Sequence, residues 1–382
     1  MLTPEYILFL SLFCSAYSYF VYPLILLLFQ NNNHYNLDSE HEDQNRPFLS
    51  LIITAYNEEK NIEQKILNTL EANYDPETME IIVASDGSTD KTNELVSKYC
   101  DRGVSLLNVI DRKGKENAQL HAINQAKGEI LIFSDVSTQV EPNALNRIAS
   151  IFKNPNIGAV SSEDRFITSS GEIAGEGAYV KYEMWLRSLE SKANSLVGLS
   201  GSFFACRKSV CKDWNISVPS DFNTAINCIK YKLIAITDPE LLGYYPNIKD
   251  ETKEYSRKVR TVLRGMAALS HNISLLNPIK YGFFAFQIFS HKLMRWLVPL
   301  FMLITLLSNI FLLGQHEMYD LLFLGQIGFY LLACIGYLSK KLRNNIVIKL
   351  IYFFVQVNLA TAQAILMFLG GKRITKWEPS KR

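Results

Sequence analysis

The sequence lacks an excess of charge of either sign, because 39 lysine and arginine residues balance 37 aspartate and glutamate residues among its 382 positions. Proteins that bind nucleic acid through its phosphates concentrate positive charge, so this balance argues against a nucleic-acid partner. The length leaves room for one large domain or two ordinary ones.

The six cysteines lack a CxxC pair, and two of them, Cys14 and Cys334, fall inside apolar stretches. Such scattered cysteines argue against both a disulfide framework and a zinc site. We therefore expect reduced thiols, as in a domain that faces the cytoplasm. The remaining four are Cys100, Cys206, Cys211 and Cys228.

Charged residues are missing altogether from residues 6–29. That stretch exceeds the roughly 20 apolar residues needed to cross a bilayer, so we predict a transmembrane helix within residues 1–30. A cleaved signal peptide is the competing interpretation, but neither a basic start nor a small-residue cleavage site accompanies the stretch. Residues 31–47 are polar and predict a linker.

Short apolar stretches alternate with segments of helical spacing from residue 48 onward. We predict strands at residues 48–53, 79–84, 104–110, 129–133 and 157–161. Alternating strands and helices of these lengths indicate an α/β fold with a mostly parallel sheet. The loops that follow the strands then lie along one edge of that sheet.

Polar side chains gather in these loops. A carboxylate at the end of a buried strand, such as Asp135, can reach a ligand or a metal, although it can equally cap a turn. Asn57 and Thr89 have the alternative role of helix caps. Acids can bind a base and a ribose, an aromatic ring can flank a base, and lysines with backbone amides can meet a diphosphate. The candidate donor-binding residues are Thr54, Tyr56, Glu58, Asp86, Lys113, Lys115 and Asp135.

The ordered set TAYNEE, SDGSTD and RKGKENAQLHAINQAKGEILIFSDVST resembles the family 2 glycosyltransferases with a nucleotide-diphospho-sugar-binding GT-A fold. The flanking apolar segments make the chain similar to the membrane-embedded members, whose relatives include cellulose, chitin and hyaluronan synthases. By this resemblance Asp86 contacts the base of the donor nucleotide. Asp135 becomes the first carboxylate of the family's Asp-x-Asp motif, near the ribose and a divalent metal.

The resemblance implies a divalent metal, Mg²⁺ or Mn²⁺, bound by Asp135. One departure from the family pattern weakens this expectation. The second aspartate of the motif is replaced by Ser137, and a hydroxyl is a poor ligand beside a carboxylate. Either Asp135 and the donor diphosphate hold the ion with water, or another acid contributes. Glu163 and Asp164 follow the next predicted strand and are the candidates.

The predicted general base is Asp221. A helix is expected over residues 177–189 and a glycine-bearing strand over residues 198–207, which resembles the acceptor-side segment of the family. Asp221 then matches the family's catalytic base, with Ser220 in place of the usual glutamate. Inversion at an anomeric carbon requires one such carboxylate, although Asp221 has the alternative role of capping the helix expected at residues 222–230.

Residues 254–264 form a basic amphipathic segment at the position of the Gln-x-x-Arg-Trp motif of processive relatives. Arg257 replaces the glutamine, Arg260 keeps the arginine, and Thr261 replaces the tryptophan. By resemblance, Arg257 and Arg260 contact the acceptor and the leaving diphosphate. Contact with anionic lipid headgroups is the alternative for Lys258 and Arg264.

The C-terminal part predicts membrane attachment. Residues 48–270 form the expected catalytic domain, residues 271–295 an interfacial segment, and residues 296–370 transmembrane helices at 296–314, 318–338 and 346–370. The basic loop at residues 340–343 favours a cytoplasmic catalytic domain. Four spans place both termini outside, whereas the basic tail at residues 371–382 favours the inside, so the crossing of the last segment stays open.

Together these features predict a multi-pass glycosyltransferase of the cell membrane that inverts the configuration at the anomeric carbon of the donor sugar. The expected partners are a nucleotide-sugar, with a UDP-sugar as the first choice, a lipid-linked or glycan acceptor, and membrane lipids. Because Thr261 lacks an aromatic ring, we expect the addition of one or a few sugars. A processive synthase, a noncatalytic relative in a polysaccharide export complex, and a homo-oligomer stay open.

Overall fold

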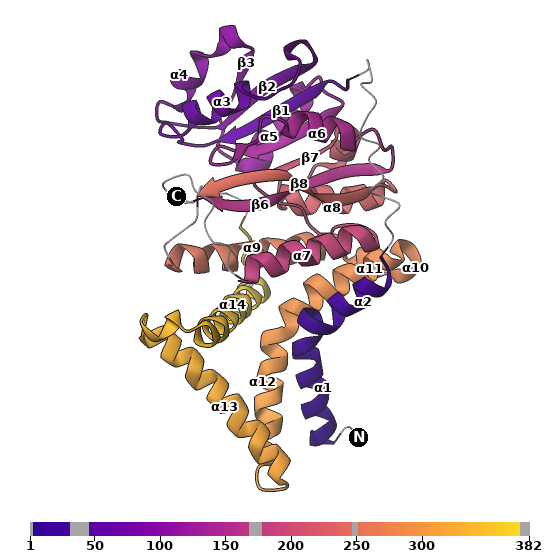
Figure 1. The fold of residues 1–382 in the computed structure, drawn as a ribbon, viewed down its shortest axis with the longest axis vertical. Helices are drawn as coiled ribbons and strands as arrows, with labels where there is room; N and C mark the ends of the chain where they lie inside the picture. The colour runs from indigo at the N-terminus through magenta and orange to yellow at the C-terminus, as the bar shows by residue number, and fades with distance from the viewer. Residues whose placement is uncertain (1–2, 31–45, 168–177, 247–250, 375–382) are drawn as a thin grey trace. The chain divides into compact units, whose positions relative to one another are not determined.

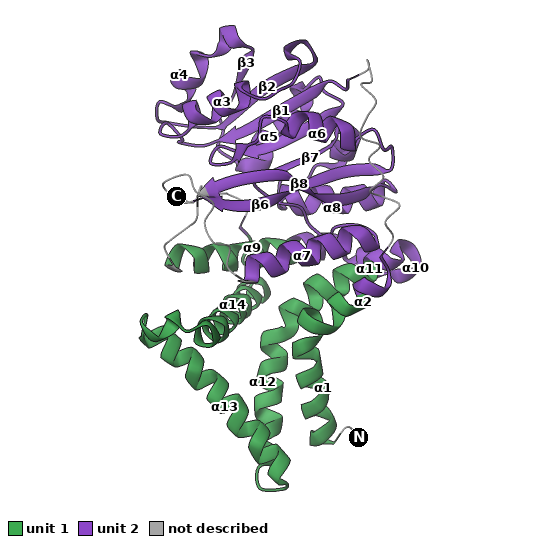
Figure 2. Ribbon diagram, viewed as in Figure 1, with its two compact units in different colours: residues 1–25, 249–267, 285–373 green, residues 26–248, 268–284, 374–382 purple. Residues whose placement is uncertain are grey.

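The computed structural model describes residues 3–30, 46–167, 178–246 and 251–374. Two compact units divide the chain (Figure 2). The sheet unit comprises Leu26–Ile248, Ala268–Phe284 and Ile374–Arg382, and the membrane unit comprises Met1–Ile25, Lys249–Ala267 and Ala285–Arg373. Residues 249–267 group with the membrane unit, and the predicted domain boundaries stay predictions.

Within the described residues, the sheet unit contains one sheet of eight strands in the order β3-β2-β1-β4-β7-β6-β8-β5 (Figure 1). Strands β1 to β4 pair in parallel, whereas β7 runs antiparallel to its neighbours β4 and β6. The predicted α/β fold with a mostly parallel sheet is confirmed. The strands are β1 Leu49–Ala55, β2 Met79–Asp86, β3 Val104–Val109, β4 Ile130–Asp135, β5 Gln139–Val140, β6 Ile157–Ile167, β7 Phe203–Arg207 and β8 Ile234–Pro246.

The central strands are covered on both faces. All seven residues of β1 are buried, as are the first five of β4. Because successive side chains point to opposite faces, Ile52 and Ile53 belong to different hydrophobic cores. Phe133 of β4 stacks on Phe204 and Trp214, with ring centroids 4.9 and 5.2 Å apart. This burial explains why these strands read as continuous apolar stretches.

The helices of the sheet unit follow the expected spacing. Helix α3 buries Ile62, Lys65, Ile66 and Thr69, which are the positions of one helical face. The predicted helix at residues 177–189 is α7, which extends to Ala193; Gly177 lies outside the described residues. The elements are α3 Ile62–Leu70, η3 Pro76–Thr78, α4 Thr92–Ser97, η4 Cys100–Arg102, α5 Lys115–Gln125, α6 Ala144–Ile151, α7 Ala178–Ala193, η5 Lys208–Asp213, α8 Ser220–Lys230, η6 Ile273–Leu276 and α10 Pro278–Tyr281.

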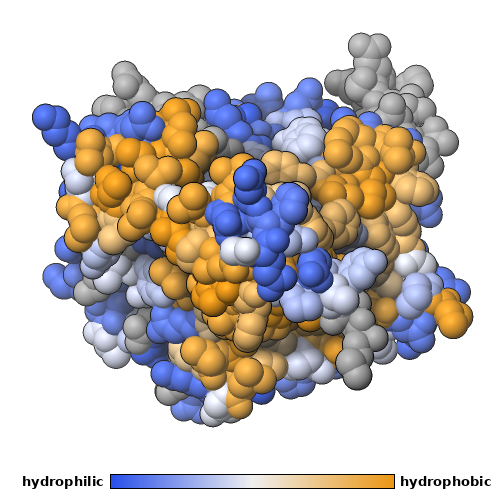
Figure 3. Space-filling model, turned by 90° about the horizontal axis from the view of Figure 1, so that it is seen from below, coloured by the Kyte–Doolittle hydropathy of each residue, from blue (hydrophilic) through white to orange (hydrophobic). Residues whose placement is uncertain are grey.

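Four helical stretches within the described residues are long and apolar enough to cross a membrane. They are Pro4–Leu28, Phe283–Leu312, Glu317–Leu338 and Ile346–Leu369, with mean hydropathies of 1.6, 1.8, 1.9 and 1.6. Many of their apolar side chains are exposed, and Figure 3 shows hydrophobic residues over much of one face, with hydrophilic residues at its centre and edges. Such exposure suits a protein surrounded by lipid, and four apolar helices agree with the predicted number of spans.

The second stretch differs from the prediction in its start. The expected interfacial segment at residues 271–295 is not separate from the span, because α11 Phe283–Ile288, η7 Phe289–Leu293 and α12 Met294–Leu312 form one 30-residue helix. A helix of that length reaches about 45 Å, which exceeds the roughly 30 Å hydrocarbon core. Its first turns therefore extend beyond the core, so an interfacial location for them stays a prediction.

Two π-helical turns face each other in the membrane unit. The first stretch consists of α1 Pro4–Ala16, η1 Tyr17–Val21 and α2 Tyr22–Leu28, and the hydroxyls of Tyr17 in η1 and Ser290 in η7 lie 2.9 Å apart. The rings of Tyr22 and Phe286 also meet at 5.9 Å. The remaining helices of this unit are α9 Glu251–His271, α13 Glu317–Leu338, η8 Leu342–Asn344 and α14 Ile346–Leu369.

Candidate functional site

The carboxyl edge of the parallel strands brings the predicted acids together. Thr54 of β1 pairs with Asp135 of β4, and Asp86 ends the neighbouring strand β2. Adjacent strands lie about 4.8 Å apart, so the ends of three strands meet at one place. The hydroxyl of Thr54 is buried there and has no hydrogen-bond partner among the described residues.

The carboxylate of Asp86 holds the loop that precedes α5. Asp86 is 1% exposed and accepts hydrogen bonds from the backbone N–H groups of Lys113 at 3.1 Å and Gly114 at 3.0 Å. Gly114 adopts a φ of 107°, a backbone conformation that residues with a side chain rarely adopt. These two amides therefore face Asp86 rather than a diphosphate, contrary to the expectation that they join the lysines there. Contact of Asp86 with the base stays a prediction.

Lys115 is the lysine at the centre of this edge. It is 7% exposed, and its Nζ donates to Asp135 Oδ1 at 2.5 Å and to the carbonyl oxygen of Gly201 at 2.8 Å. Lys113 is instead exposed and pairs with Asp111 at 3.6 Å. Of the two predicted lysines, only Lys115 is thus held among the acids.

The predicted base lies beside the same loop. A Cβ atom added to Gly201 would lie 3.5 Å from Asp221 Oδ2, so the carboxylate approaches the Gly201 backbone closely. Pro219, not Asp221, is the N-cap of α8, and Asp221 lies in the first turn. The Asp221 carboxylate forms no hydrogen bond within the described part of the chain. The capping role considered for Asp221 is therefore not the one it has.

The loop of residues 200–202, here called the serine loop, connects the donor side with Asp221. The backbone N–H of Asp135 donates to the carbonyl of Ser202 at 2.9 Å. Only residues 203–207 pair as strand β7, because Ser200 and Ser202 make contacts of their own. The predicted strand at residues 198–207 was therefore too long at its start.

Asp164 holds the serine loop in place, which sequence reasoning missed. Its Oδ1 accepts hydrogen bonds from Ser200 at 2.6 Å, Ser202 at 3.3 Å and Ser162 at 3.4 Å. Glu163, on the opposite face of β6, pairs with Arg165 at 2.8 Å. The repeated serines at positions 200 and 202 indicate a polar loop, but nothing in the sequence links that loop to Asp164.

A buried cation, Lys65, was also missed. Its Nζ donates to the carbonyl oxygen of Thr138 at 2.7 Å, just after Ser137. Burial lowers the pKa of Lys65 to about 7, while the nearby Asp135 carboxylate acts in the opposite direction. Lys65 lies on the inward face of α3, at the helical spacing of core residues. The sequence pattern therefore does not show that its ammonium reaches a polar partner.

The first loop of the edge places Tyr56 under a cation. The guanidinium of Arg112 lies 3.8 Å from the centre of the Tyr56 ring and covers one face. Glu58 accepts a hydrogen bond from the Asn61 side chain at 3.0 Å. The Asn57 side chain accepts from the backbone N–H of Thr89 at 2.8 Å, so these two residues join neighbouring loops instead of capping their own helices.

The residues fit a divalent cation in a limited way. Within the described residues, no group of three or more histidine, cysteine, aspartate or glutamate side chains could hold a metal. Asp135 Oδ1 is bound by Lys115, and Asp164 by serine hydroxyls. Asp135 Oδ2 remains as one carboxylate ligand, so a hard cation would need oxygens from a bound diphosphate and water to complete its shell.

Arg257 and Arg260 belong to α9 in the membrane unit. Arg257 forms two hydrogen bonds with Glu254, at 2.8 and 2.7 Å. Lys258 Nζ lies 3.6 Å from the centre of the Phe353 ring, so its ammonium contacts an aromatic side chain of the protein. The alternative contact of Lys258 with lipid headgroups stays open. The roles of Arg257 and Arg260 at the acceptor and the diphosphate stay predictions.

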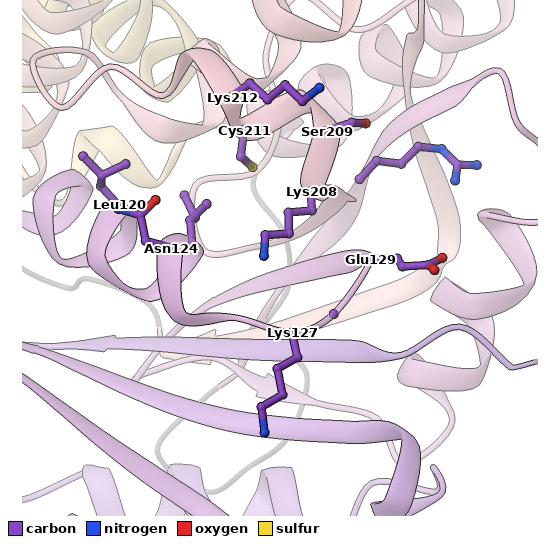
Figure 4. A pocket seen from close by; sticks show the side chains of 11 residues that line it. Leu120, Asn124, Lys127, Glu129, Lys208, Ser209, Cys211 and Lys212 are labelled. Atoms are coloured by element: carbon purple, nitrogen blue, oxygen red, sulfur yellow. The ribbon is translucent and has the colours of Figure 1, made fainter.

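A cavity of the sheet unit lies away from these acids. Its volume is about 640 Å³, and its lining includes Lys127 and Glu129, which precede β4 (Figure 4). It therefore opens at the amino end of β4, opposite to Asp135. Two of its basic side chains bind backbone, since Arg207 donates to three carbonyl oxygens and Lys208 Nζ donates to that of Ala126. These bonds indicate a structural role.

Comparison with known proteins agrees with this architecture. The family model described as Glycosyl transferase family 2 matches residues 50–214. The poly-beta-1,6-N-acetyl-D-glucosamine synthase of Staphylococcus epidermidis is 28% identical over 218 residues, which cover 55% of this chain and 51% of that protein. The protein of the same name from Staphylococcus aureus strain COL is 29% identical over 171 residues, or 43% and 40%. The chain thus matches about half the length of these relatives.

A solved structure resembles nearly the whole fold. The mannosyltransferase PcManGT from Pyrobaculum calidifontis, in complex with GDP-Man and Mn²⁺, has a TM-score of 0.71 at 18% identity and covers 97% of this chain and 100% of its own. This likeness supports the fold of the chain. Residues 50–214 thus match glycosyl transferase family 2, and the structural likeness agrees with the predicted GT-A fold.

Proposed function

We propose that this protein is a membrane-bound inverting glycosyltransferase. It transfers a sugar from a nucleotide-diphospho-sugar, with a UDP-sugar as the first choice, to a lipid-linked or polysaccharide acceptor. One observation carries the proposal: the unbonded carboxylate of Asp221 lies beside Gly201, whose carbonyl binds Lys115, and Lys115 also binds Asp135. A candidate base, a cation and a donor-side acid thus share one small site.

Each group has a chemical role in the proposed transfer. The Asp221 carboxylate accepts the proton of the acceptor hydroxyl as that oxygen attacks the anomeric carbon, while the bond to the leaving diphosphate breaks on the opposite side. The ammonium of Lys115 stabilises the negative charge that develops on the diphosphate. A divalent cation, when bound, supplies further positive charge there, and Asp135 Oδ2 is the protein oxygen that would hold it.

The surrounding residues bind the donor. Asp86 and Tyr56 recognise the base, Thr54 and Glu58 contribute polar contacts, and Lys113 adds charge at the rim. The Thr54 hydroxyl supports this assignment, since a buried hydroxyl without a partner favours a ligand that supplies one. Arg257 and Arg260 serve the acceptor and the diphosphate from α9. The site faces the cytoplasm, in keeping with the basic loop between the last two apolar helices.

The experiment that tests the proposal measures transfer by the purified full chain. The protein in nanodiscs receives radiolabelled UDP-sugars and GDP-mannose together with extracted membrane lipids, and lipid-linked products are identified by mass spectrometry. We expect Asp221→Asn to lower turnover by about 10² to 10⁴ with nearly unchanged donor affinity, as for a lost general base. Asp213→Asn is the matched control, because the carboxylate of this exposed aspartate accepts a hydrogen bond from the Tyr231 hydroxyl at 2.8 Å and has no role in the proposed transfer.

Two results would contradict the proposed roles. An equal loss of donor affinity in Asp221→Asn would make Asp221 a binding residue instead of the base. A wild-type protein that neither transfers nor hydrolyses any nucleotide-sugar would support the alternative of a noncatalytic relative in an export complex.

A processive polysaccharide synthase is the second candidate function, favoured by the similarity to proteins named as poly-beta-1,6-N-acetyl-D-glucosamine synthases. Thr261, in place of an aromatic platform, favours short products instead. Size-resolved analysis of radiolabelled product decides between them. A ladder that reaches high polymer without other transferases would establish the processive alternative.

A further inference from the structure

A second cavity lies inside the membrane unit, among the four helices that are apolar enough to cross a membrane. Its volume is about 330 Å³, near the lower end of the roughly 300 to 1,000 Å³ typical of small-molecule sites. Aliphatic and aromatic side chains dominate the lining, so the cavity suits hydrocarbon better than water. They include Leu8 and Leu12 of α1, Met302 of α12, Leu321, Leu322 and Phe329 of α13, and Phe354 of α14.

Two amide side chains interrupt this apolar lining. Asn309 Nδ2 donates to Gln326 Oε1 at 2.9 Å, and Gln326 Nε2 donates to the carbonyl oxygen of Met302 at 3.3 Å. A carbonyl can only accept, so it fixes the orientation of Gln326 and, through it, that of Asn309. Among the described residues, Asn309 Oδ1 therefore has no donor, although Asn309 is only 1% exposed.

An acceptor left without a partner in such a place is unfavourable. The cost of a buried unsatisfied group is about 1 to 3 kcal/mol, and a lipid environment offers no water to reduce it. A ligand that brings a hydroxyl or amide N–H would remove this cost. Because the side chains around Asn309 are apolar, the remainder of the ligand must also be apolar.

The depth of Asn309 agrees with a lipid. Helix α12 ends at Leu312, so a rise of about 1.5 Å per residue places Asn309 roughly 5 Å from the helix end. At that depth the polar part of a lipid meets its chains.

We propose that this cavity binds a membrane lipid with a free hydroxyl near its headgroup. The hydroxyl donates to Asn309 Oδ1, and one chain occupies the apolar space beside Phe329 and Phe354. The site differs from the proposed glycosyl-transfer site in both location and chemistry, so either can fail without the other.

Two glycines of α13 provide a matched pair of variants. Gly325 lines the cavity, and a Cβ atom there would meet nothing within 4 Å. Gly328 has the same open surroundings but does not line the cavity. Gly325→Leu therefore fills the space without a backbone clash, whereas Gly328→Leu changes the same helix equally and leaves the space open.

The experiment uses the full chain in phosphatidylcholine nanodiscs with a small fraction of diacylglycerol that carries a diazirine in one acyl chain. After irradiation, mass spectrometry of digested protein locates the labelled residues. We expect label at Met302, Phe329 or Phe354 in the wild type and in Gly328→Leu, and at least tenfold less in Gly325→Leu.

A second probe tests the hydroxyl. Phosphatidylcholine with the same diazirine chain has no hydroxyl donor, so it should label these residues several-fold less than diacylglycerol does. Asn309→Leu should abolish that preference, and this variant keeps the test valid if Gly325→Leu fails to fold. Equal labelling in both glycine variants, equal labelling by both probes, or label confined to outward residues such as Leu331 would overturn the proposal. Crosslinks to a second copy would do the same.

Discussion

Replacing Lys115 by methionine removes the cation at the centre of the proposed donor site while keeping a side chain of similar length. The ammonium makes two hydrogen bonds, to Asp135 Oδ1 and to the Gly201 carbonyl, and the lysine side chain is 9% exposed. Loss of a charge-assisted contact with the diphosphate costs about 1.5 to 3 kcal/mol. We therefore expect nucleotide-sugar affinity to fall roughly 10- to 150-fold.

Calorimetry of the full chain with UDP and with a UDP-sugar measures this loss. Lys127→Met is the control, because Lys127 lies at the opposite end of β4 and should bind as the wild type does. Lys113→Met discriminates between the two predicted lysines, since Lys113 is exposed and should matter less. Wild-type affinity in Lys115→Met, or a larger loss in Lys113→Met, would refute the assignment of the diphosphate to Lys115.

Three further expectations concern the site and its product. Asp86→Ala and Asp135→Ala should each weaken nucleotide binding by about 1.5 to 3 kcal/mol, and calorimetry that gave wild-type affinity for both would reject the donor site. Burial lowers the pKa of Lys65 to about 7 from an unfolded value of 10.5, so the folded state binds fewer protons between these values and stability should rise with pH there. Thermal unfolding at pH 7 and 9 checks this, and the same rise in Lys65→Met would exclude Lys65 as its source. Thr261→Trp should lengthen products slightly, because stacking on an aromatic ring is worth roughly 1 to 3 kcal/mol; unchanged sizes of labelled products would count against a platform at this position.

The sheet could be predicted because its strands are apolar throughout and its loops are polar. The stretch around Asp135 illustrates this, since a strand covered on both faces must be a continuous apolar run, and the first polar residues mark its end. The same logic placed Thr54, Asp86 and Lys115 at one edge. Parallel strands deliver their carboxyl ends to the same side whatever the details of packing.

Contacts between distant segments could not be predicted in this way. The hydrogen bonds that Ser200 and Ser202 donate to Asp164 depend on β7 lying between β4 and β6, and the sequence of a short antiparallel strand does not identify its neighbours. Lys65 is a similar case, because its spacing on α3 fits a core position and only folding shows that its ammonium reaches Thr138. The membership of α9 in the membrane unit also depends on packing that its amphipathic pattern does not specify.

The reversed direction of β7 has a consequence for how this protein family can diversify. The proposed donor residues of the sheet unit all precede residue 140, whereas Gly201 and Asp221 come later in the chain and reach the same edge because β7 starts where β4 ends. Under the proposed roles, donor binding and the catalytic base are encoded in separate stretches of the sheet unit. At this edge the two stretches are connected by the bond from Lys115 to Gly201 and by the bond from the Asp135 N–H to the Ser202 carbonyl, so recombination between relatives could exchange one preference and retain the other where both bonds and the pairing of β4 with β7 are kept.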